Sequence, residues 1–167
     1  LMEIDDLVGA AFLPTDGSAS PSDTTMALVK GARARGVRFI EGCKVTGIVV
    51  DRGRVAAVDT DLGRIQCEIL VNCAGQWAKE IGALAGVPVP VCSMEHQYMI
   101  SEPIEGVPRD LPTLRDPDKL VYFKEEVGGL CMGGYEPDPI PWAIGGLPED
   151  FEFKLLAENY DHFMGLV

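Results

Sequence analysis

The feature that most restricts the fold of this chain is a series of three short β-type runs that ends at a glycine. The runs, at residues 44–50, 54–60 and 64–74, are separated by the turn sequences DRG at 51–53 and DLG at 61–63, and this spacing predicts an antiparallel meander. The last run ends in the mostly apolar sequence ILVNCA, which predicts a strand buried on both faces. Gly75 then opens a predicted helix, and a nucleotide can bind at a strand-glycine-helix junction of this kind.

A helix is predicted before this meander and a second sheet after it. Ser20 and Asp23 have the spacing of a capping box around Pro21, so a helix is expected from Pro21 to about Arg35, with Gly36 as its stop. The runs at 91–100, 119–124 and 130–135 predict further strands, the proline-rich stretch 137–148 predicts a loop, and 149–163 predicts a helix. The sequence as a whole therefore predicts an α+β fold.

Charge and cysteine content exclude several classes of protein. Fourteen Lys and Arg residues stand against 26 Asp and Glu, for a net charge of -12, which disfavours nucleic acid and anionic membranes as partners. No apolar run approaches the roughly 20 residues of a membrane helix. The five cysteines form no CxxC pair and the chain has two His. We therefore expect no metal site and no disulfide framework, but buried thiols in a reducing compartment, the cytoplasm or, in a eukaryote, the mitochondrial matrix.

Five segments spread over nearly the whole chain carry a family resemblance. They are AFLPTDG at 11–17 with Pro21, KGARARG at 30–36, VNCAGQWA at 71–78, EHQY at 95–98, and LRDP at 114–117 continuing through Tyr122 to GGYE at 133–136. In this order they resemble the D-amino-acid-oxidase-like flavoproteins, and within them the sarcosine and dimethylglycine dehydrogenases. The resemblance implies an FAD-dependent amine oxidoreductase that acts on CH-NH bonds and demethylates a small methylated amino acid.

The resemblance also implies how the chain is divided. Residues 1–87 correspond to part of an FAD-binding lobe, and residues 88–167 to a mostly antiparallel substrate-domain sheet with a helix. The first FAD signature of such proteins, G-x-G-x-x-G, is absent from this sequence, and the chain begins with Leu1. We therefore expect an internal piece of a longer protein, inactive alone, whose missing N- and C-terminal parts complete the FAD site of the parent.

Four residues are implied to contact FAD: Val45, Ala74, Gly75 and Trp77. In the family, the backbone around Lys44 and Val45 meets the adenine, and the Ala74-Gly75 turn approaches the ribityl and pyrophosphate part. A side chain at Gly75 would collide with a ligand lying over the strand end. The alternative, that Gly75 is only a turn residue before a helix, is disfavoured by Trp77 in the matching segment.

The candidate catalytic residues are His96, Tyr98 and Tyr122. Strand side chains repeat every two residues, so His96 and Tyr98 are predicted to share a face. His96 could accept the proton of the amine, because imidazole has a reference pKa of about 6.5, and Tyr98 could donate a hydrogen bond to the substrate carboxylate. The alternative is a half-buried His beside a packing Tyr.

Tyr122 and Lys124 form a second predicted same-face pair. Close relatives often have Arg at the second position, and Lys124 lacks the planar fork that matches a carboxylate, so we expect it to be exposed to solvent. The glycine-rich strand 128–134 is expected to be crowded, either against flavin or substrate or within a tight sheet. Tyr135, which follows it, is a candidate wall of the pocket.

Two alternative functions stay open at this point. The chain could belong to a non-catalytic binding module that kept the sheet and lost the cofactor. It could also belong to a sibling amine or amino-acid oxidase that acts on another substrate, such as glycine or a methylaminobutanoate. A G-x-G-x-x-G turn upstream in the same reading frame would favour an enzyme.

Overall fold

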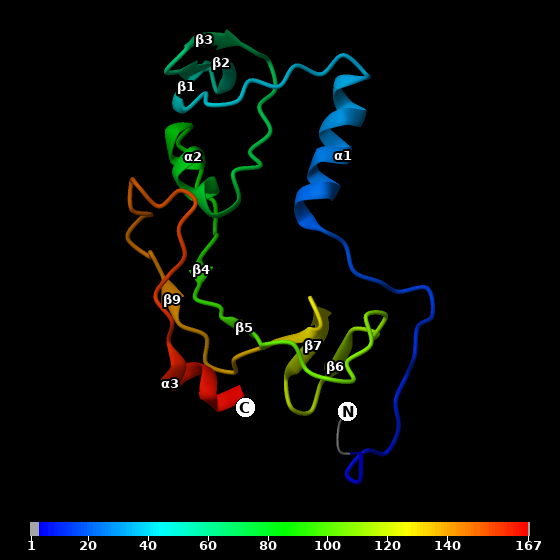
Figure 1. The fold of residues 1–167 in the computed structure, drawn as a ribbon. Coiled ribbons are helices and arrows are strands. Elements are labelled where there is room, and N and C mark those ends of the chain that lie inside the picture. Colours follow the sequence, from blue (N-terminus) through cyan, green and yellow to red (C-terminus); the bar gives the residue numbers. More distant parts are fainter. Residues whose placement is uncertain (1–3, 167) are drawn as a thin grey trace. The chain divides into compact units, whose positions relative to one another are not determined.

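The computed structural model describes residues 4–166, and these form two compact units (Figure 1). Unit 1 combines the segments up to residue 31, 96–139 and from 156 onward, and unit 2 combines 32–95 and 140–155. Both consist of short helices and antiparallel strands. The predicted α+β class is confirmed, whereas the division into a cofactor lobe and a substrate lobe at residue 87 stays a prediction.

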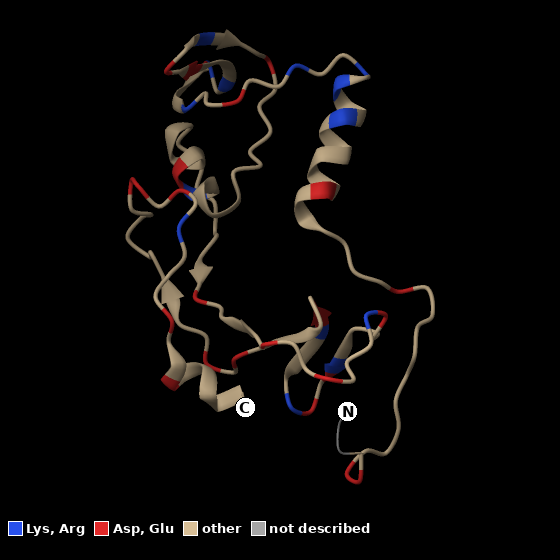
Figure 2. Ribbon diagram, viewed as in Figure 1, with Lys and Arg blue, Asp and Glu red and all other residues tan. Residues whose placement is uncertain are grey.

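The first helix, α1 (Pro21–Arg33), begins where the capping residues predict. The Asp23 amide donates to Ser20 Oγ at 3.3 Å, so one of the unpaired amides of the first turn is satisfied. Asp23 is the acidic residue of the first turn. Figure 2 shows an acidic position near the start of α1 and basic positions near its end, an order that suits the helix dipole. The helix ends two residues before Arg35, and Gly36 then turns the chain with φ of 86°.

Unit 2 contains the predicted meander. Strands β1 (Val45–Asp51), β2 (Arg54–Thr60) and β3 (Gly63–Gln66) pair antiparallel in sequence order. Positive φ at both Arg52 and Gly53 gives the tight β1–β2 turn the backbone twist that a two-residue hairpin needs. Ala57 and Val58 of β2 are buried, because the central strand is the one with a neighbour on each side.

The prediction of a strand over 69–74 is wrong. Residues 67–74 form no strand, and Ile69 and Val71 are 82% and 73% exposed. Burial on both faces requires neighbouring strands and covering layers, and none of the described strands pairs with this segment. The helix that follows is confirmed, as a 3-10 turn over Gly75–Trp77 and then α2 (Ala78–Leu84).

Unit 1 is built on a four-stranded antiparallel sheet of order β5-β8-β7-β6. Its strands are β5 (Tyr98–Ile100), β6 (Leu114–Asp116), β7 (Val121–Glu126) and β8 (Gly129–Gly134). Residues 91–100 were predicted as one strand, but they contain β5 and the separate β4 (Ser93–Met94). In unit 2, β4 pairs with β9 (Pro141–Trp142), which lies inside the predicted loop 137–148.

The long helix predicted over 149–163 is also wrong, since only α3 (Tyr160–Phe163) and a 3-10 turn (Met164–Leu166) form. Phe153 has φ of 55°, which breaks a right-handed helix. Phe153 and Leu155 are 102% and 96% exposed, so the apolar face of such a helix has no surface to cover, and burial of that face is what stabilises most helices. Within residues 4–166, no helix is long and apolar enough to cross a bilayer.

Candidate functional site

The two faces of the sheet in unit 1 differ in character. Val121 and Met132 point to one face and form a buried cluster with Phe163 of α3. Side chains one position along each strand point the opposite way, so the second face carries a different set of residues, here called the polar face. It presents Tyr98, Arg115, Tyr122, Lys124 and Glu126.

A single row of register partners crosses this polar face. Tyr98 pairs with Gly133, Gly133 with Tyr122, and Tyr122 with Arg115. A Cβ atom at residue 133 would overlap the Tyr122 hydroxyl, so the Tyr122 ring lies across the glycine. The row therefore brings two hydroxyls and one guanidinium to a single face.

The crowding predicted for the glycine-rich strand comes from the chain itself. Gly133 is covered by Tyr122, and a Cβ at Gly134 would lie 2.6 Å from Leu166 Cδ1. At Gly129, the Ser101 carbonyl oxygen would lie 2.6 Å from such a Cβ. Of the two predicted causes of crowding, a ligand or a tight sheet, these contacts fit the tight sheet, in which the glycines permit close packing.

Aromatic contacts extend the row at the end of β8. The Tyr122 and Tyr135 ring centroids are 5.9 Å apart, and the Arg115 guanidinium carbon lies 5.9 Å from the Tyr135 centroid. Burial raises the pKa of Tyr122, and Cys131 and Tyr135 raise it further. Tyr122 therefore stays protonated at neutral pH and can donate its hydroxyl hydrogen.

His96 lies just before β5 and contacts a carboxylate. Its Nδ1 is 3.0 Å from Glu136 Oε2, and the side chains of His96 and Glu136 are 46% and 5% exposed. Strand β5 begins at Tyr98, so His96 lies outside the paired residues. That His96 and Tyr98 share a face therefore stays a prediction. The contact between Glu136 and His96 was not predicted from the sequence. The feature that could have drawn attention to Glu136 is its position directly after the GGY sequence at 133–135.

The two basic side chains of the polar face differ in their partners. Lys124 Nζ lies 2.6 Å from Glu126 Oε2, and this hydrogen bond raises the pKa of Lys124. Lys124, which was predicted to be exposed to solvent, is thus half exposed and paired with Glu126. Among the described residues, Arg115 has no carboxylate within salt-bridge distance and rests on Tyr135. Sequence reasoning missed Arg115, because its position opposite Tyr122 depends on the β6–β7 register.

The turn at Ala74 and Gly75 belongs to unit 2 and is held by Asn72. Asn72 Nδ2 donates to the Ala78 carbonyl at 2.9 Å, and its Oδ1 accepts from the Ala74 amide at 3.2 Å. Gly75 has φ of +55°, and a Cβ there would have no atom within 4 Å. Gly75 is therefore a turn glycine beside open space and not a packing glycine. Trp77 ends the 3-10 turn directly before α2, and its amide donates to the Ala74 carbonyl at 3.0 Å.

Val45 lies at the start of β1, an edge strand of the meander. Both backbone groups of Lys44 bind Asp61, the amide to Oδ1 at 2.9 Å and the carbonyl to the amide at 3.0 Å. Because backbone groups alternate along an antiparallel edge strand, those of Val45 point to the open side. Free backbone at Val45 and free space at Gly75 fit a dinucleotide such as FAD.

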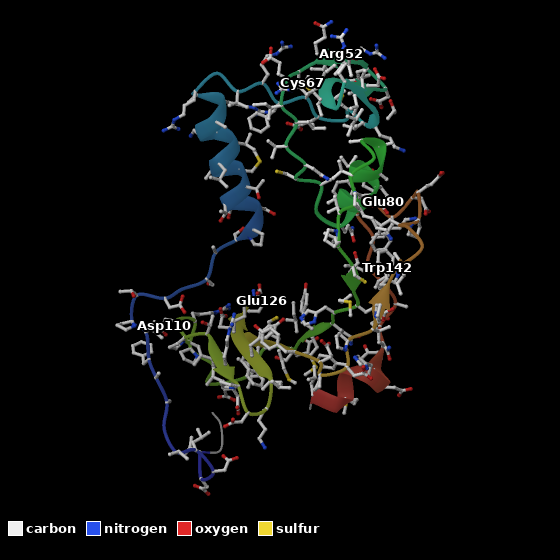
Figure 3. The ribbon with its side chains drawn as sticks, turned by 180° about the vertical axis from the view of Figure 1, so that it is seen from behind. Arg52, Cys67, Glu80, Asp110, Glu126 and Trp142 are labelled. Atoms are coloured by element: carbon white, nitrogen blue, oxygen red, sulfur yellow. The ribbon has the colours of Figure 1, made fainter. Side chains whose placement is uncertain are left out.

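The helix that follows the Gly75 turn, α2, is held by hydrogen bonds to the segment 140–155. Lys79 Nζ donates to the Ile144 carbonyl at 2.9 Å, and the Leu147 amide donates to Glu80 Oε1 at 3.3 Å. Figure 3 shows Glu80 on α2 and Trp142 on β9 within the same unit. The turn thus rests on a helix anchored to the 140–155 segment.

The family of the chain follows from its similarity to known proteins. A sequence profile of the FAD dependent oxidoreductase family, DAO, matches residues 1–166, and the chain belongs to this family. Mouse sarcosine dehydrogenase is 44% identical over 98% of this chain and 18% of its own length. The mouse pyruvate dehydrogenase phosphatase regulatory subunit is 35% identical over 100% of this chain and 19% of its own length.

A solved structure agrees with this assignment. L-proline dehydrogenase from P. horikoshii superimposes with a TM-score of 0.71 at 26% identity, over 92% of this chain and 38% of the other. The chain spans about a fifth of the length of the curated relatives named above. It therefore corresponds to one part of a larger flavoprotein architecture.

Proposed function

We propose that this chain is part of an FAD-dependent oxidoreductase that demethylates a small N-methyl amino acid such as sarcosine or dimethylglycine. The observation that carries the proposal is the polar face, where Tyr98, Tyr122 and Arg115 share one row. A substrate with a carboxylate and an amine needs a cation and hydroxyls at one end and a proton acceptor at the other. The similarity to sarcosine dehydrogenase supports this choice of substrate.

The three residues of the row and the nearby His96 each have a proposed role. The Arg115 guanidinium and the Tyr98 hydroxyl bind the substrate carboxylate, since a guanidinium can bind both of its oxygens. His96 accepts the proton of the substrate ammonium, which leaves a neutral amine. A methyl group of this amine can then lose a hydride, and the amine becomes an iminium. Tyr122 remains a neutral donor in the same row.

The proposed cofactor contacts lie in unit 2. Val45 binds the adenine end through its outward backbone groups, and Ala74 and Gly75 allow the ribityl and pyrophosphate part to approach, with Trp77 beside them. FAD, when bound, supplies the acceptor for the hydride. Its remaining phosphate contacts belong to parts of the enzyme outside this chain.

A non-catalytic role is the second candidate. It is favoured by the likeness to a protein named as the regulatory subunit of a phosphatase. Such a protein could keep the sheet without the chemistry, because fold alone does not determine function. By contrast, a sibling oxidase would differ only in its substrate. For the compartment, we propose the mitochondrial matrix in a eukaryote and the cytoplasm otherwise.

The intact protein distinguishes these candidates. Purified after gel filtration, it is expected to retain a stoichiometric flavin spectrum, and N-methyl amino acids are expected to bleach it under anaerobic conditions. Glycine, proline and 4-methylaminobutanoate serve as comparison substrates. A colourless, folded protein would favour the regulatory role, and bleaching by a comparison substrate alone would favour a sibling oxidase.

A further inference from the structure

The side chain of Glu136 is buried, with 5% of it exposed, beside the half-exposed His96. Its Oε2 atom lies 3.0 Å from His96 Nδ1, and among the described residues no Lys or Arg lies within salt-bridge distance of this carboxylate. A buried carboxylate without a partner is costly. The contact with His96 is therefore what stabilises Glu136 in its place.

We propose that Glu136 is a positioning residue that sets the tautomer and orientation of His96. An ionised carboxylate can only accept hydrogen bonds, so His96 Nδ1 must carry the hydrogen. The partner of one ring nitrogen determines the state of the other. Nε2 of neutral His96 then has a lone pair that can accept a proton, and the His96 side chain as a whole is 46% exposed.

This inference rests on the proposed function and specifies how its proton acceptor works. The N-H bond of the substrate ammonium breaks, its proton forms a bond with His96 Nε2, and the electron pair stays on the amine nitrogen. The resulting imidazolium lies against the Glu136 carboxylate, which stabilises the positive charge. No oxidant or reductant takes part in this step.

The groups around this pair come from several strands. Tyr122 of β7 is near enough that the Glu136 charge contributes to its raised pKa, as does Tyr98 of β5. Tyr135 precedes Glu136 and contacts the Arg115 guanidinium from β6. Among these groups, the Glu136 carboxylate is the one that contacts a ring nitrogen of His96.

The test uses the intact enzyme with the substitution Glu136→Gln and the control Glu125→Gln. The control removes a carboxylate that pairs with Arg109 at 3.0 Å on the opposite face of the same sheet. Glu136→Gln is expected to slow flavin reduction about tenfold or more and to move the acid limb of its pH profile lower by about one unit, because a neighbouring anion favours the protonated imidazole. Glu136→Asp is expected to restore part of the rate. Glu125→Gln should leave both the rate and the profile unchanged.

A second measurement separates this inference from the proposed function. In histidine-selective 15N spectra of the intact protein, the signal absent from His96→Asn reports the tautomer, with hydrogen on Nδ1 expected in the parent and a mixture in Glu136→Gln. If no N-methyl amino acid reduces the flavin, the proposed function fails. The 15N measurement of the His96 tautomer still tests whether Glu136 positions His96. An unchanged His96 signal and an unchanged pH profile in Glu136→Gln would overturn the positioning role.

Discussion

Tyr122 can lie across the polar face only because residue 133 is glycine. Any Cβ at that position would occupy the space of the phenol group, so one missing side chain on β8 determines where a hydroxyl on β7 is presented. The same packing partly buries the Tyr122 side chain, and this burial raises the pKa of its hydroxyl. At the scale of single residues, packing and chemistry are thus linked.

Gly133→Ala is therefore expected to displace Tyr122 and to lower the free energy of unfolding by about 1–3 kcal/mol, the usual cost of overpacking. Gly145→Ala is the control, because a Cβ there has no atom within 4 Å and its stability should be nearly unchanged. Denaturant unfolding of the intact protein measures both. Equal stabilities for the two variants would contradict the packing described for Tyr122.

The hydroxyl of Tyr98 provides a test of substrate binding. Tyr98→Phe is expected to raise the dissociation constant of the substrate, because a hydrogen bond to a charged carboxylate is worth about 1.5–3 kcal/mol. The limiting rate of flavin reduction should change little. Tyr160→Phe is the control in titration calorimetry, because Tyr160 is an exposed residue of α3. A Tyr98→Phe variant with parental affinity would remove Tyr98 from the site.

The raised pKa of Tyr122 predicts a pH dependence of stability. The unfolded chain releases this proton near pH 10, while the folded protein holds it to higher pH. The stabilising contribution is therefore complete below pH 10 and is lost as pH rises through the folded pKa. Unfolding measurements from pH 9 to 11 should show a steeper loss for the parent than for Tyr122→Phe, and identical slopes would argue against a buried hydroxyl.

At the scale of elements, the glycine turn before α2 combines backbone strain with open space. Gly75 and Gly86 lie at opposite ends of α2, both have positive φ, and neither has an atom within 4 Å of its Cβ position. The same substitution at the two sites therefore carries similar backbone strain. A difference between the two variants must then come from a bound ligand.

Gly75→Val is expected to lose most of its bound FAD in the intact enzyme, whereas Gly86→Val should retain it. Both apoproteins should lose about 1–3 kcal/mol of stability, the cost of a β-branched residue with positive φ. Flavin absorbance per folded molecule and thermal melting give the two readouts. Equal retention of FAD in both variants would identify Gly75 as a plain turn residue.

Elements with local signals were predictable, and those that depend on distant partners were not. Ser20 and Pro21 mark the start of α1, and Gly53 marks the β1–β2 hairpin, since capping and turn geometry are encoded within a few residues. Residues 69–74 are apolar enough for a buried strand, yet no described strand pairs with them. The helix predicted over 149–163 failed because Phe153 leaves the right-handed region.

The same limit applies to the candidate site. Tyr98 and Tyr122 could be selected from the sequence through their family segments. The row that joins them to Arg115 could not, because it depends on the pairing of four strands. Glu136 was missed for the same reason, since its contact with His96 crosses 40 residues of chain.

At the scale of the whole molecule, each unit contains one part of the proposed chemistry. Unit 1 holds the polar face and the His96–Glu136 pair, and unit 2 holds the open edge at Val45 and the turn at Gly75. The family assignment covers both units. The central claim is that the enzyme built from them removes a hydride from an N-methyl group.

The most direct test of this claim is the rate of anaerobic flavin reduction in the intact enzyme, with sarcosine deuterated either in its N-methyl group or at its α-carbon. We predict that deuterium in the methyl group slows reduction several-fold, because a methyl C-H bond breaks in that step, and that deuterium at the α-carbon has little effect. The opposite pattern would show amino-acid oxidase chemistry at the α-carbon and would contradict the account.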